Sequence, residues 1–380
     1  MAIDNKDKKI LNVPHLRFPE FSGEWEMVSL QDIATINPKS DPLQNTFIYI
    51  DLEAVEKGEL RKIQEIMREE APSRAQRVID NNDILFQCVR PYQKNNYIHR
   101  ILNTSNQQWV ASTGYAQIRT TELPNYIYHL LNTDEFNRKV MVRCTGSSYP
   151  AINSEDLATI HLYYTPDKKE QLKISRLLDL LDKRIATQNK IIEKLQSLIK
   201  GVAQHCIKES TSGNTYVKLG DICQITTGKL DANAQVDNGI YPFFTCAEQP
   251  FKIDSFAFDT EALLISGNGA NLGYINYYKG KFNAYQRTYV LDLFSENIQY
   301  IKWALKVLLP KRIAIEKSSS NTPYIVLSTL TDLRLPIPCK SKQSFIANLM
   351  QSLERKLSNQ IAQYDSYNYL KQYLLRQMFI

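Results

Sequence analysis

The sequence lacks the clustered cysteines and histidines that a metal site needs. Its six cysteines form no Cys-x-x-Cys pair, and none of its five histidines lies at zinc-ligand spacing from them. A disulfide framework is equally disfavoured, so we expect reduced thiols and a cytoplasmic protein. No apolar run reaches the ~18 residues that a membrane-spanning helix requires, and segment 1–10 has no hydrophobic stretch after its charges. We therefore expect neither a metal site nor membrane contact.

Catalytic motifs are missing as well. Segment 321–324, Asn-Thr-Pro-Tyr, departs from the Asn-Pro-Pro-Tyr of adenine methyltransferases at its second residue. Segment 267–273 is one residue away from a dinucleotide-binding fingerprint but has no strand-turn-helix context, and no phosphate-binding P-loop occurs. The Pro-Asp pair at 166–167 is not followed by the Glu-x-Lys of a nuclease strand. We therefore expect no catalytic residue and no cofactor in this chain.

A large excess of charge of one sign is also absent. The 46 Lys and Arg residues against 40 Asp and Glu residues leave a net charge of +6. This balance allows nucleic-acid binding without indicating it. With 380 residues the chain is longer than one ordinary domain with a single hydrophobic core. A hydrophobic content of 43% is enough to form the cores of two or more domains.

What the sequence does contain is an internal repeat. A segment ending in a heptad helix at 171–204 recurs 172 positions later, at 343–376. Upstream, the Pro-Ala-Ile of 150–152 corresponds to the Pro-Tyr-Ile of 323–325 at a shift of 173. Equivalent helix residues include Gln171, Ile174, Leu178, Leu181 and Ile185, matched by Gln343, Ile346, Met350, Leu353 and Leu357. Such a pseudo-two-fold protein suits a pseudo-symmetric target, of which duplex DNA is the commonest.

The two repeated helices are predicted to form a coiled coil. Apolar residues between positions 174 and 202 follow the 4-3 alternation of a seam, with Gln188 in the one gap. Gln360 takes the same place in the second helix, where Lys371 departs from the pattern and Leu370 is expected to cover it. Either the glutamines occupy these positions by chance, or they meet across an antiparallel pair and set its register.

The predicted fold class is α+β, with two mixed α/β domains in pseudo-two-fold repeat, separated by two long antiparallel coiled-coil helices. One helix is expected over 126–142. The seam faces of Leu195, Ile199, Tyr364 and Tyr367 are expected to be exposed until a partner covers them. The expected boundaries are an N-terminal arm at 1–21, a first mixed domain at 22–165, a central helix at 166–208, a second mixed domain at 209–339 and a C-terminal helix at 340–380.

Polar loops at matching places in the two domains are the candidate DNA contacts. The loop at 87–97 follows a strand in the first domain, and its counterpart at 266–271 follows a strand in the second. Arg, Asn, Gln and Lys can read base edges, while Ser and backbone amides can hold phosphates. The alternative is that these loops are merely solvated. The predicted contact residues are Gln87, Arg90, Tyr92, Gln93, Lys94, Arg143, Ser147, Ser148, Tyr149, Lys229, Asn268, Asn271, Arg287, Ser319 and Asn321.

The order of these motifs resembles that of the specificity subunits of type I restriction-modification systems, over nearly the full chain. Each motif alone is unspecific, and their order and duplication carry the resemblance. They are Val-Pro-His-Leu-Arg-Phe-Pro-Glu-Phe at 13–21 with Gly-Glu-Trp-Glu at 23–26, the Leu-x-Asp-Ile openings at 30 and 219, Thr-Gly-Ser-Ser-Tyr-Pro-Ala-Ile at 145–152, and the helix pattern from Gln171 to Gln188.

This resemblance implies two target-recognition domains, each reading one half of an interrupted DNA sequence. It also implies double-stranded DNA, two modification subunits and restriction subunits as partners. S-adenosylmethionine, ATP and Mg²⁺ are then expected on those subunits and not on this chain, which is a non-catalytic reader. The helix pair is expected to act as a ruler. Four residues inserted after Gln188, about 6 Å of helix, should change the gap and leave both half-sites intact.

Two other hypotheses about the function remain open. The chain could be the recognition subunit of a different assembly, such as a two-subunit type II restriction enzyme with an interrupted site. It could also be a coiled-coil scaffold that binds proteins and not DNA. A scaffold accounts for the repeat equally well, but it does not account for paired loops rich in Arg, Asn, Gln and Ser. An enzyme acting alone is the weakest alternative.

Overall fold

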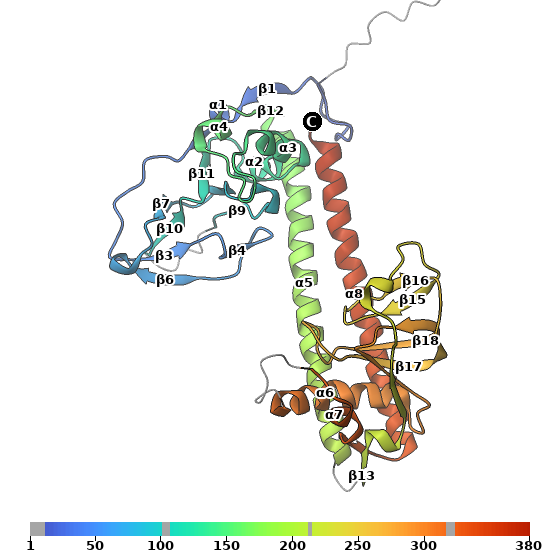
Figure 1. The fold of residues 1–380 in the computed structure, drawn as a ribbon. Coiled ribbons are helices and arrows are strands. Elements are labelled where there is room, and N and C mark those ends of the chain that lie inside the picture. The colour runs from blue at the N-terminus through green and yellow to red at the C-terminus, as the bar shows by residue number, and fades with distance from the viewer. Residues whose placement is uncertain (1–11, 101–106, 212–214, 317–323) are drawn as a thin grey trace, which may run out of the picture. The chain divides into compact units, whose positions relative to one another are not determined.

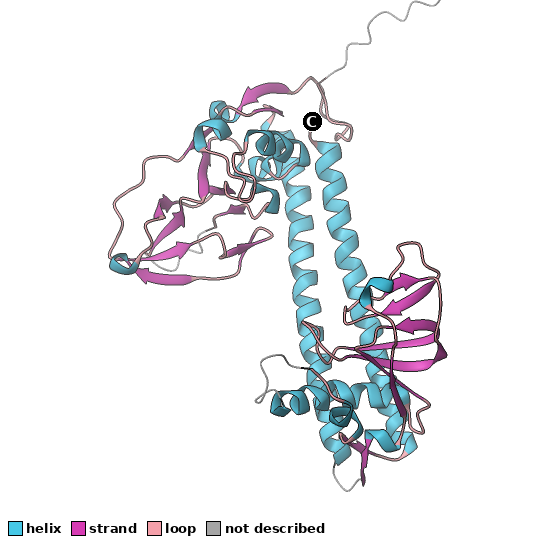
Figure 2. Cartoon of the chain, viewed as in Figure 1, coloured by secondary structure: helices cyan, strands magenta, loops and turns pink. Residues whose placement is uncertain are grey.

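The computed structural model describes residues 12–100, 107–211, 215–316 and 324–380. It divides into two compact units. Unit 1 comprises Met1–Asn189 and Gln363–Ile380, and unit 2 comprises Lys190–Ala362. Each unit combines strands with helices (Figure 2), so the predicted α+β class is confirmed.

Unit 1 contains two four-stranded sheets. The first is antiparallel and places β8 and β11 at its centre, where side chains from Ile84 to Gln87 are all buried. The second is mixed, because β10 pairs parallel with β3 and antiparallel with β7. In spatial order the strands are β2 (Ala34–Ile36), β11 (Tyr115–Thr120), β8 (Ile84–Gln87) and β9 (Tyr97–Ile98), then β6 (Gln64–Met67), β3 (Thr46–Ile50), β10 (Gln108–Ser112) and β7 (Ala75–Ile79).

The remaining elements of unit 1 frame these sheets. The predicted single helix over 126–142 is wrong, because the side chain of Thr133 caps a new helix by accepting from the amide of Phe136 at 3.2 Å. The elements are β1 (Glu26–Ser29), α1 (Leu30–Ile33), β4 (Val55–Glu56), β5 (Glu59–Leu60), η1 (Arg68–Glu70), η2 (Pro91–Gln93), α2 (Pro124–Leu131), α3 (Asp134–Arg143), α4 (Ser154–Ala158) and β12 (His161–Tyr164).

Unit 2 is built on one six-stranded sheet. Three of its strands, β14, β19 and β17, pair antiparallel in the same way as β2, β11 and β8 of unit 1. The strands in spatial order are β14 (Gln224–Thr227), β19 (Thr288–Asp292), β17 (Phe258–Ser266), β18 (Ile275–Ala284), β15 (Tyr241–Phe244) and β16 (Phe251–Ile253). The other elements are β13 (Thr215–Lys218), η3 (Leu219–Asp221), η4 (Ala232–Ala234), α6 (Ile298–Glu316), α7 (Leu327–Thr331) and β20 (Arg334–Ile337).

The repeat seen in the sequence is a repeat of structure. The pair β1–β12 of unit 1 corresponds to β13–β20 of unit 2, both antiparallel. The amide of Leu30 donates to the carbonyl oxygen of Ile160 at 3.0 Å, and that of Leu219 donates to Leu333 at 2.9 Å. Equivalent hydrogen bonds therefore hold the first and last strands of each unit together.

Two long helices, α5 (Lys168–Thr211) and α8 (Lys340–Met378), confirm the predicted heptad helices (Figure 1). In unit 1, Lys371 forms an ion pair with Asp182 at 2.6 Å, and Arg184 donates to the hydroxyl of Tyr367 at 3.2 Å. Residue numbers rise along α5 as they fall along α8, so the two segments run antiparallel within this unit.

Two details of the predicted seam are wrong. Leu370 is 43% exposed and does not take the seam position, because Lys371 itself lies there and pairs with Asp182. Leu195 and Ile199 are each 7% exposed and not solvent-facing, because they pack with Ile346 and Met350 in the core of unit 2.

The register prediction for the two glutamines stays a prediction. Gln188 belongs to unit 1 and is 2% exposed, while Gln360 belongs to unit 2 and is partly buried.

Candidate nucleic-acid interface

Each unit brings three distant segments together at the end of its central strand. In unit 1, the amide of Cys88 donates to the carbonyl oxygen of Gly114 at 3.0 Å, and the amide of Ile152 donates to Cys88 at 3.1 Å. In unit 2, the amide of Gly267 donates to Arg287 at 2.8 Å, and the amide of Ile325 donates to Gly267 at 2.8 Å. We call this arrangement the loop junction.

The loop junction follows the sequence repeat, since Ile152 and Ile325 are equivalent at the shift of 173. It therefore aligns the loops after β8 and β17 residue by residue, with Cys88 equivalent to Gly267 and Gly114 equivalent to Arg287. The loop after β8 and the loop after β17 are two versions of one structure. Their backbones make equivalent hydrogen bonds, and their side chains differ.

In unit 1 the loop junction presents Arg90, Tyr92 and Tyr149. The guanidinium of Arg90 lies over the ring of Tyr149, 4.2 Å from its centroid. Tyr149 is 64% exposed and Tyr92 is 50% exposed. The neighbouring Ser147 and Ser148 are also exposed. An arginine and two exposed aromatic rings beside serine hydroxyls can stack on, and hydrogen-bond to, nucleic acid.

Three residues of unit 1 that we predicted to contact DNA form polar contacts within the unit. Gln87 is 2% exposed, and its amide donates to Val89 at 2.8 Å and to the side chain of Gln93 at 2.9 Å. Lys94 pairs with Asp134 at 2.7 Å. These contacts help to hold the loop in shape, and whether the two residues also contact DNA stays a prediction.

Arg143 is the third of these residues. Its guanidinium donates to the carbonyl oxygen of Asp156 at 2.7 Å and to the hydroxyl of Thr159 at 2.8 Å. These bonds tie the end of α3 to α4, which leaves fewer donors for a phosphate. Gln93, whose side chain accepts from Gln87, is exposed and stays a candidate contact.

In unit 2 the loop junction presents Lys229 and Arg287, which are both exposed. Asn268 and Asn271 are partly buried and turn toward Cys246. The thiol of Cys246 donates to Asn268 Oδ1 at 3.0 Å, and Asn271 Nδ2 donates to the carbonyl oxygen of Cys246 at 3.0 Å. The two asparagines thus bind the loop after β17 to the loop after β15. Ser319 and Asn321 lie outside the described residues.

The sequence reasoning missed the residues that allow these loops to approach each other. A Cβ on Gly228 would lie 1.9 Å from the carbonyl oxygen of Ala284, and one on Gly267 would lie 2.5 Å from that of Arg287. Only glycine fits such close backbone approaches. Isolated glycines next to strands are the available sequence signal. Nothing in the sequence pointed to Cys246.

The buried thiols of the two units are unsuited to nucleophilic chemistry. Burial raises the pKa of Cys88 to about 12 and that of Cys223 to about 12, so both stay protonated at neutral pH. Among the residues that the structure describes, no group of three His, Cys, Asp or Glu side chains could hold a metal ion. Within the same residues, no helix is both long and apolar enough to cross a bilayer.

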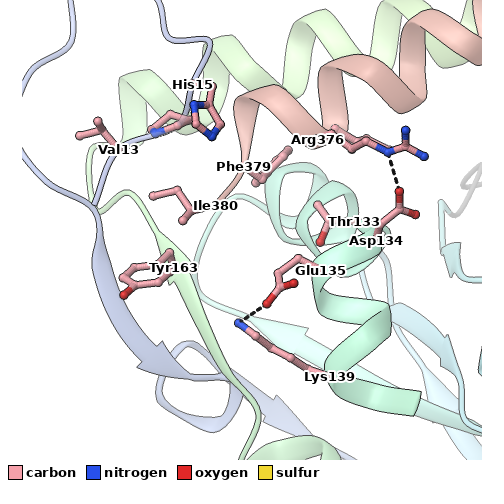
Figure 3. Close-up of a pocket in the computed structure, with 12 residues that line it drawn as sticks. Val13, His15, Thr133, Asp134, Glu135, Lys139, Tyr163, Arg376, Phe379 and Ile380 are labelled. Carbon is pink, nitrogen blue, oxygen red and sulfur yellow. Dashed lines mark hydrogen bonds and ion pairs between the residues drawn. The ribbon is translucent and has the colours of Figure 1, made fainter. Parts of the chain in front are cut away.

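A cavity of about 480 Å³ lies elsewhere in unit 1, where the N-terminal segment meets the start of α3 and the end of α8 (Figure 3). Its charged groups are paired with one another. Arg376 contacts Asp134 at 2.7 Å, and Lys139 contacts Glu135 at 3.3 Å. The Lys94 ammonium and, less strongly, the guanidinium of Arg376 hold the pKa of the Asp134 carboxyl below its usual range. This cavity offers a ligand no uncompensated charge.

A duplicated mixed α/β unit, with exposed polar loops on a repeated frame and two antiparallel helices, defines a class of recognition protein. A sequence profile of the type I restriction modification DNA specificity domain matches residues 22–197 and again residues 211–364. The two matches cover most of the chain, so the chain belongs to this family.

Individual relatives agree with the family. A segment of 137 residues is 44% identical to the type I restriction enzyme EcoDI specificity subunit of Escherichia coli, and covers 36% of this chain and 30% of that subunit. The type I restriction enzyme MjaIX specificity subunit of Methanocaldococcus jannaschii is 24% identical over 274 residues, covering 62% of this chain and 63% of that subunit. The matches thus span less than two thirds of either relative's length.

Solved structures show the same fold. The crystal structure of an S subunit of a type I restriction-modification system from M. genitalium matches with a TM-score of 0.65 at 16% identity, covering 97% of this chain and 99% of that one. A chain from a study of complex assembly and conformational transition of the type I R-M system matches with a TM-score of 0.59 at 22% identity, covering 95% and 98%.

Proposed function

We propose that this chain is the non-catalytic DNA-recognition subunit of a type I restriction-modification complex. It reads a two-part target interrupted by a gap, one part with each unit. The observation that carries the proposal is the loop junction, built twice with the same hydrogen bonds and with different side chains on it. Arg90 and Tyr92 stand in unit 1 where Gly269 and Asn271 stand in unit 2. One frame with two sets of side chains suits two unlike half-sites.

The proposal includes partner subunits that bring the chemistry. Two modification subunits with S-adenosylmethionine would methylate adenine, and restriction subunits would use ATP and Mg²⁺. Membership of the specificity family supports this division of labour. Exposed leucines on α5, Leu180 in unit 1 at 65% and Leu198 in unit 2 at 53%, offer apolar contacts on both units.

The test is selection from a randomised duplex pool. The chain is purified together with the modification subunits encoded beside it, bound DNA is recovered, and the enriched duplexes are sequenced. We expect two short, unlike blocks at a fixed spacing. The modification subunits without this chain serve as the control and should enrich no such motif.

Two results would contradict the proposal. An intact complex that enriches no motif would favour the protein-binding scaffold. A motif obtained only with a single neighbouring subunit that fuses nuclease and methyltransferase would favour the two-subunit type II assembly.

A further inference from the structure

Arg90 adopts a backbone conformation that arginine disfavours. Its φ is +54°, and its amide is held by the carbonyl oxygen of Pro150 at 2.8 Å. A non-glycine residue in this left-handed region is strained, because its Cβ crowds the backbone. The strain is local to the recognition loop, because Arg90 lies two residues after Cys88 of the loop junction.

The second unit shows what this position favours. Two residues after Gly267 of its loop junction stands Gly269, with φ at +78° and no atom within 4 Å of where a Cβ would lie. The two units thus share a left-handed backbone at the equivalent place. Glycine adopts it without strain. Arginine at a position whose backbone suits glycine therefore points to a use for its side chain.

The guanidinium of Arg90 contacts an aromatic ring and has no counter-charge among the described residues. Its central carbon lies 4.2 Å from the centroid of the Tyr149 ring, and this cation–π contact restricts where the guanidinium points. Within the described part of the chain, no carboxylate pairs with it. By contrast, two other arginines of unit 1 are paired with carboxylates, Arg17 with Glu170 at 2.6 Å and Arg119 with Asp83 at 2.7 Å.

A planar guanidinium that has no carboxylate partner matches guanine better than the other bases. Guanine presents two adjacent acceptors, O6 and N7, on its major-groove edge, and the arginine fork donates to both at once. A phosphate also accepts from arginine, but contact with a phosphate does not require an aromatic ring beside the guanidinium.

We propose that Arg90 reads a guanine in the half-site bound by unit 1, with Tyr149 orienting its fork. Unit 2 has Gly269 at the equivalent position, and glycine has no side chain that could contact a base. The two half-sites therefore differ at this repeat position. The inference rests on the proposed function, and it adds the residue, the base and the unit.

The test compares wild type with Arg90→Gly and Arg90→Lys, each as the complete complex, in the same randomised-pool selection. Arg90→Gly removes the backbone strain and copies the loop of unit 2, so the loop should keep its shape. Arg90→Lys keeps the charge and loses the fork. In both variants one G·C pair should disappear from one half of the selected motif, while the other half and the gap stay unchanged.

Binding to two duplexes that differ only at that G·C pair gives the magnitude. Wild type should discriminate by roughly 5- to 150-fold, the usual range for a bidentate arginine contact, and both variants by less than about 2-fold. Arg138→Ala is the matched control, because it removes a 66% exposed arginine from α3 of the same unit. This variant should keep the wild-type motif and discrimination.

The outcomes separate the two proposals. A wild-type complex that enriches no two-part motif overturns the proposed function. A wild-type motif that Arg90→Gly leaves intact, with weaker binding to all duplexes alike, overturns only the inference and makes Arg90 a phosphate contact. Loss of base preference in both halves would also overturn it, because the residue would then act on the whole complex.

Discussion

Gln171 and Gln343 make the same three hydrogen bonds in the two units, near the starts of α5 and α8. Gln171 donates to Glu122 at 2.7 Å and to the carbonyl oxygen of Thr165 at 2.8 Å, and accepts from the amide of Leu123 at 3.3 Å. Each glutamine thus joins its long helix to the start of a shorter helix. The equivalent bonds of Gln343 reach Glu296 at 2.7 Å, Pro338 at 2.9 Å and Asn297 at 3.0 Å.

Replacing either glutamine by leucine should destabilise its own unit. Gln171 is 0% exposed and Gln343 is 1% exposed, and leucine leaves a carboxylate, a carbonyl and an amide without their partner. We expect a loss of about 1–3 kcal/mol for each variant, measured by urea unfolding of the full chain. Gln196→Leu, at an exposed position of α5, is the control and should change stability by less than about 0.5 kcal/mol. Equal effects from all three variants would contradict this role.

The sequence paired Gln171 with Gln343 because repeats align by position. It could not supply Glu122 or Glu296, which lie 49 and 47 residues away in the chain. Hydrogen-bond partners at such separations depend on how the chain folds back, and no local pattern encodes them.

At the scale of elements, each unit places a charged contact between a short helix and a long one. In unit 1, His129 of α2 contacts Asp179 of α5 at 2.9 Å. In unit 2, Lys302 of α6 contacts Glu354 of α8 at 2.8 Å. His129 is 0% exposed and Lys302 is 7% exposed, so each acidic partner compensates a buried nitrogen. The contact between the short and the long helix is thus present in both units, with a histidine and an aspartate in unit 1 and a lysine and a glutamate in unit 2.

The contact of unit 1 should make stability depend on pH. Burial raises the pKa of Asp179, but the hydrogen bonds and charge of His129, with Asn125 and Arg100, lower it more, so the net pKa is below 3.8. A depressed folded-state pKa contributes stability that is present above the unfolded value and is lost as pH falls through the folded one. The stability that wild type gains over Asp179→Asn should therefore be complete near pH ~6 and shrink below pH ~4.

Urea unfolding of both proteins between pH ~3 and ~6 checks this expectation. Asp365→Asn, at an exposed position of α8 in the same unit, should show no such pH-dependent difference. A difference between wild type and Asp179→Asn that stays constant across this range would exclude the linkage.

At the scale of the whole molecule, α5 and α8 each belong to both units. Residues 189 and 190 divide α5 between the units, and residues 362 and 363 divide α8. The chain therefore passes from one unit to the other only within continuous helices. A helix lengthens by 1.5 Å per residue and keeps its direction, which is the physical basis for expecting these helices to act as a ruler.

Matched insertions test the ruler. Four residues of good helix formers are added after Gln188 in α5 and four after Ala362 in α8, about 6 Å each. The gap of the selected motif should lengthen by one or two base pairs, at about 3.4 Å each, with both half-sites unchanged. Asn189→Ala, which alters the same place in α5 without changing its length, should keep the wild-type gap. Altered bases within the half-sites would refute the ruler.

Sequence by itself determined the repeat and the two heptad helices. These features depend on periodic burial and on turn residues, which are local along the chain. For the same reason the alignment of Ile152 with Ile325 was correct, although nothing indicated that their amides would close equivalent loop junctions.

Only the tertiary structure decided which polar side chains face outward. Gln87, Arg90 and Arg143 are equally plausible DNA contacts in a sequence, because each carries donors in a loop or beside one. Folding commits Gln87 and Arg143 to groups inside unit 1 and leaves the guanidinium of Arg90 stacked on Tyr149. Whether a donor is used depends on acceptors that arrive from distant segments, so its availability is a property of the folded chain.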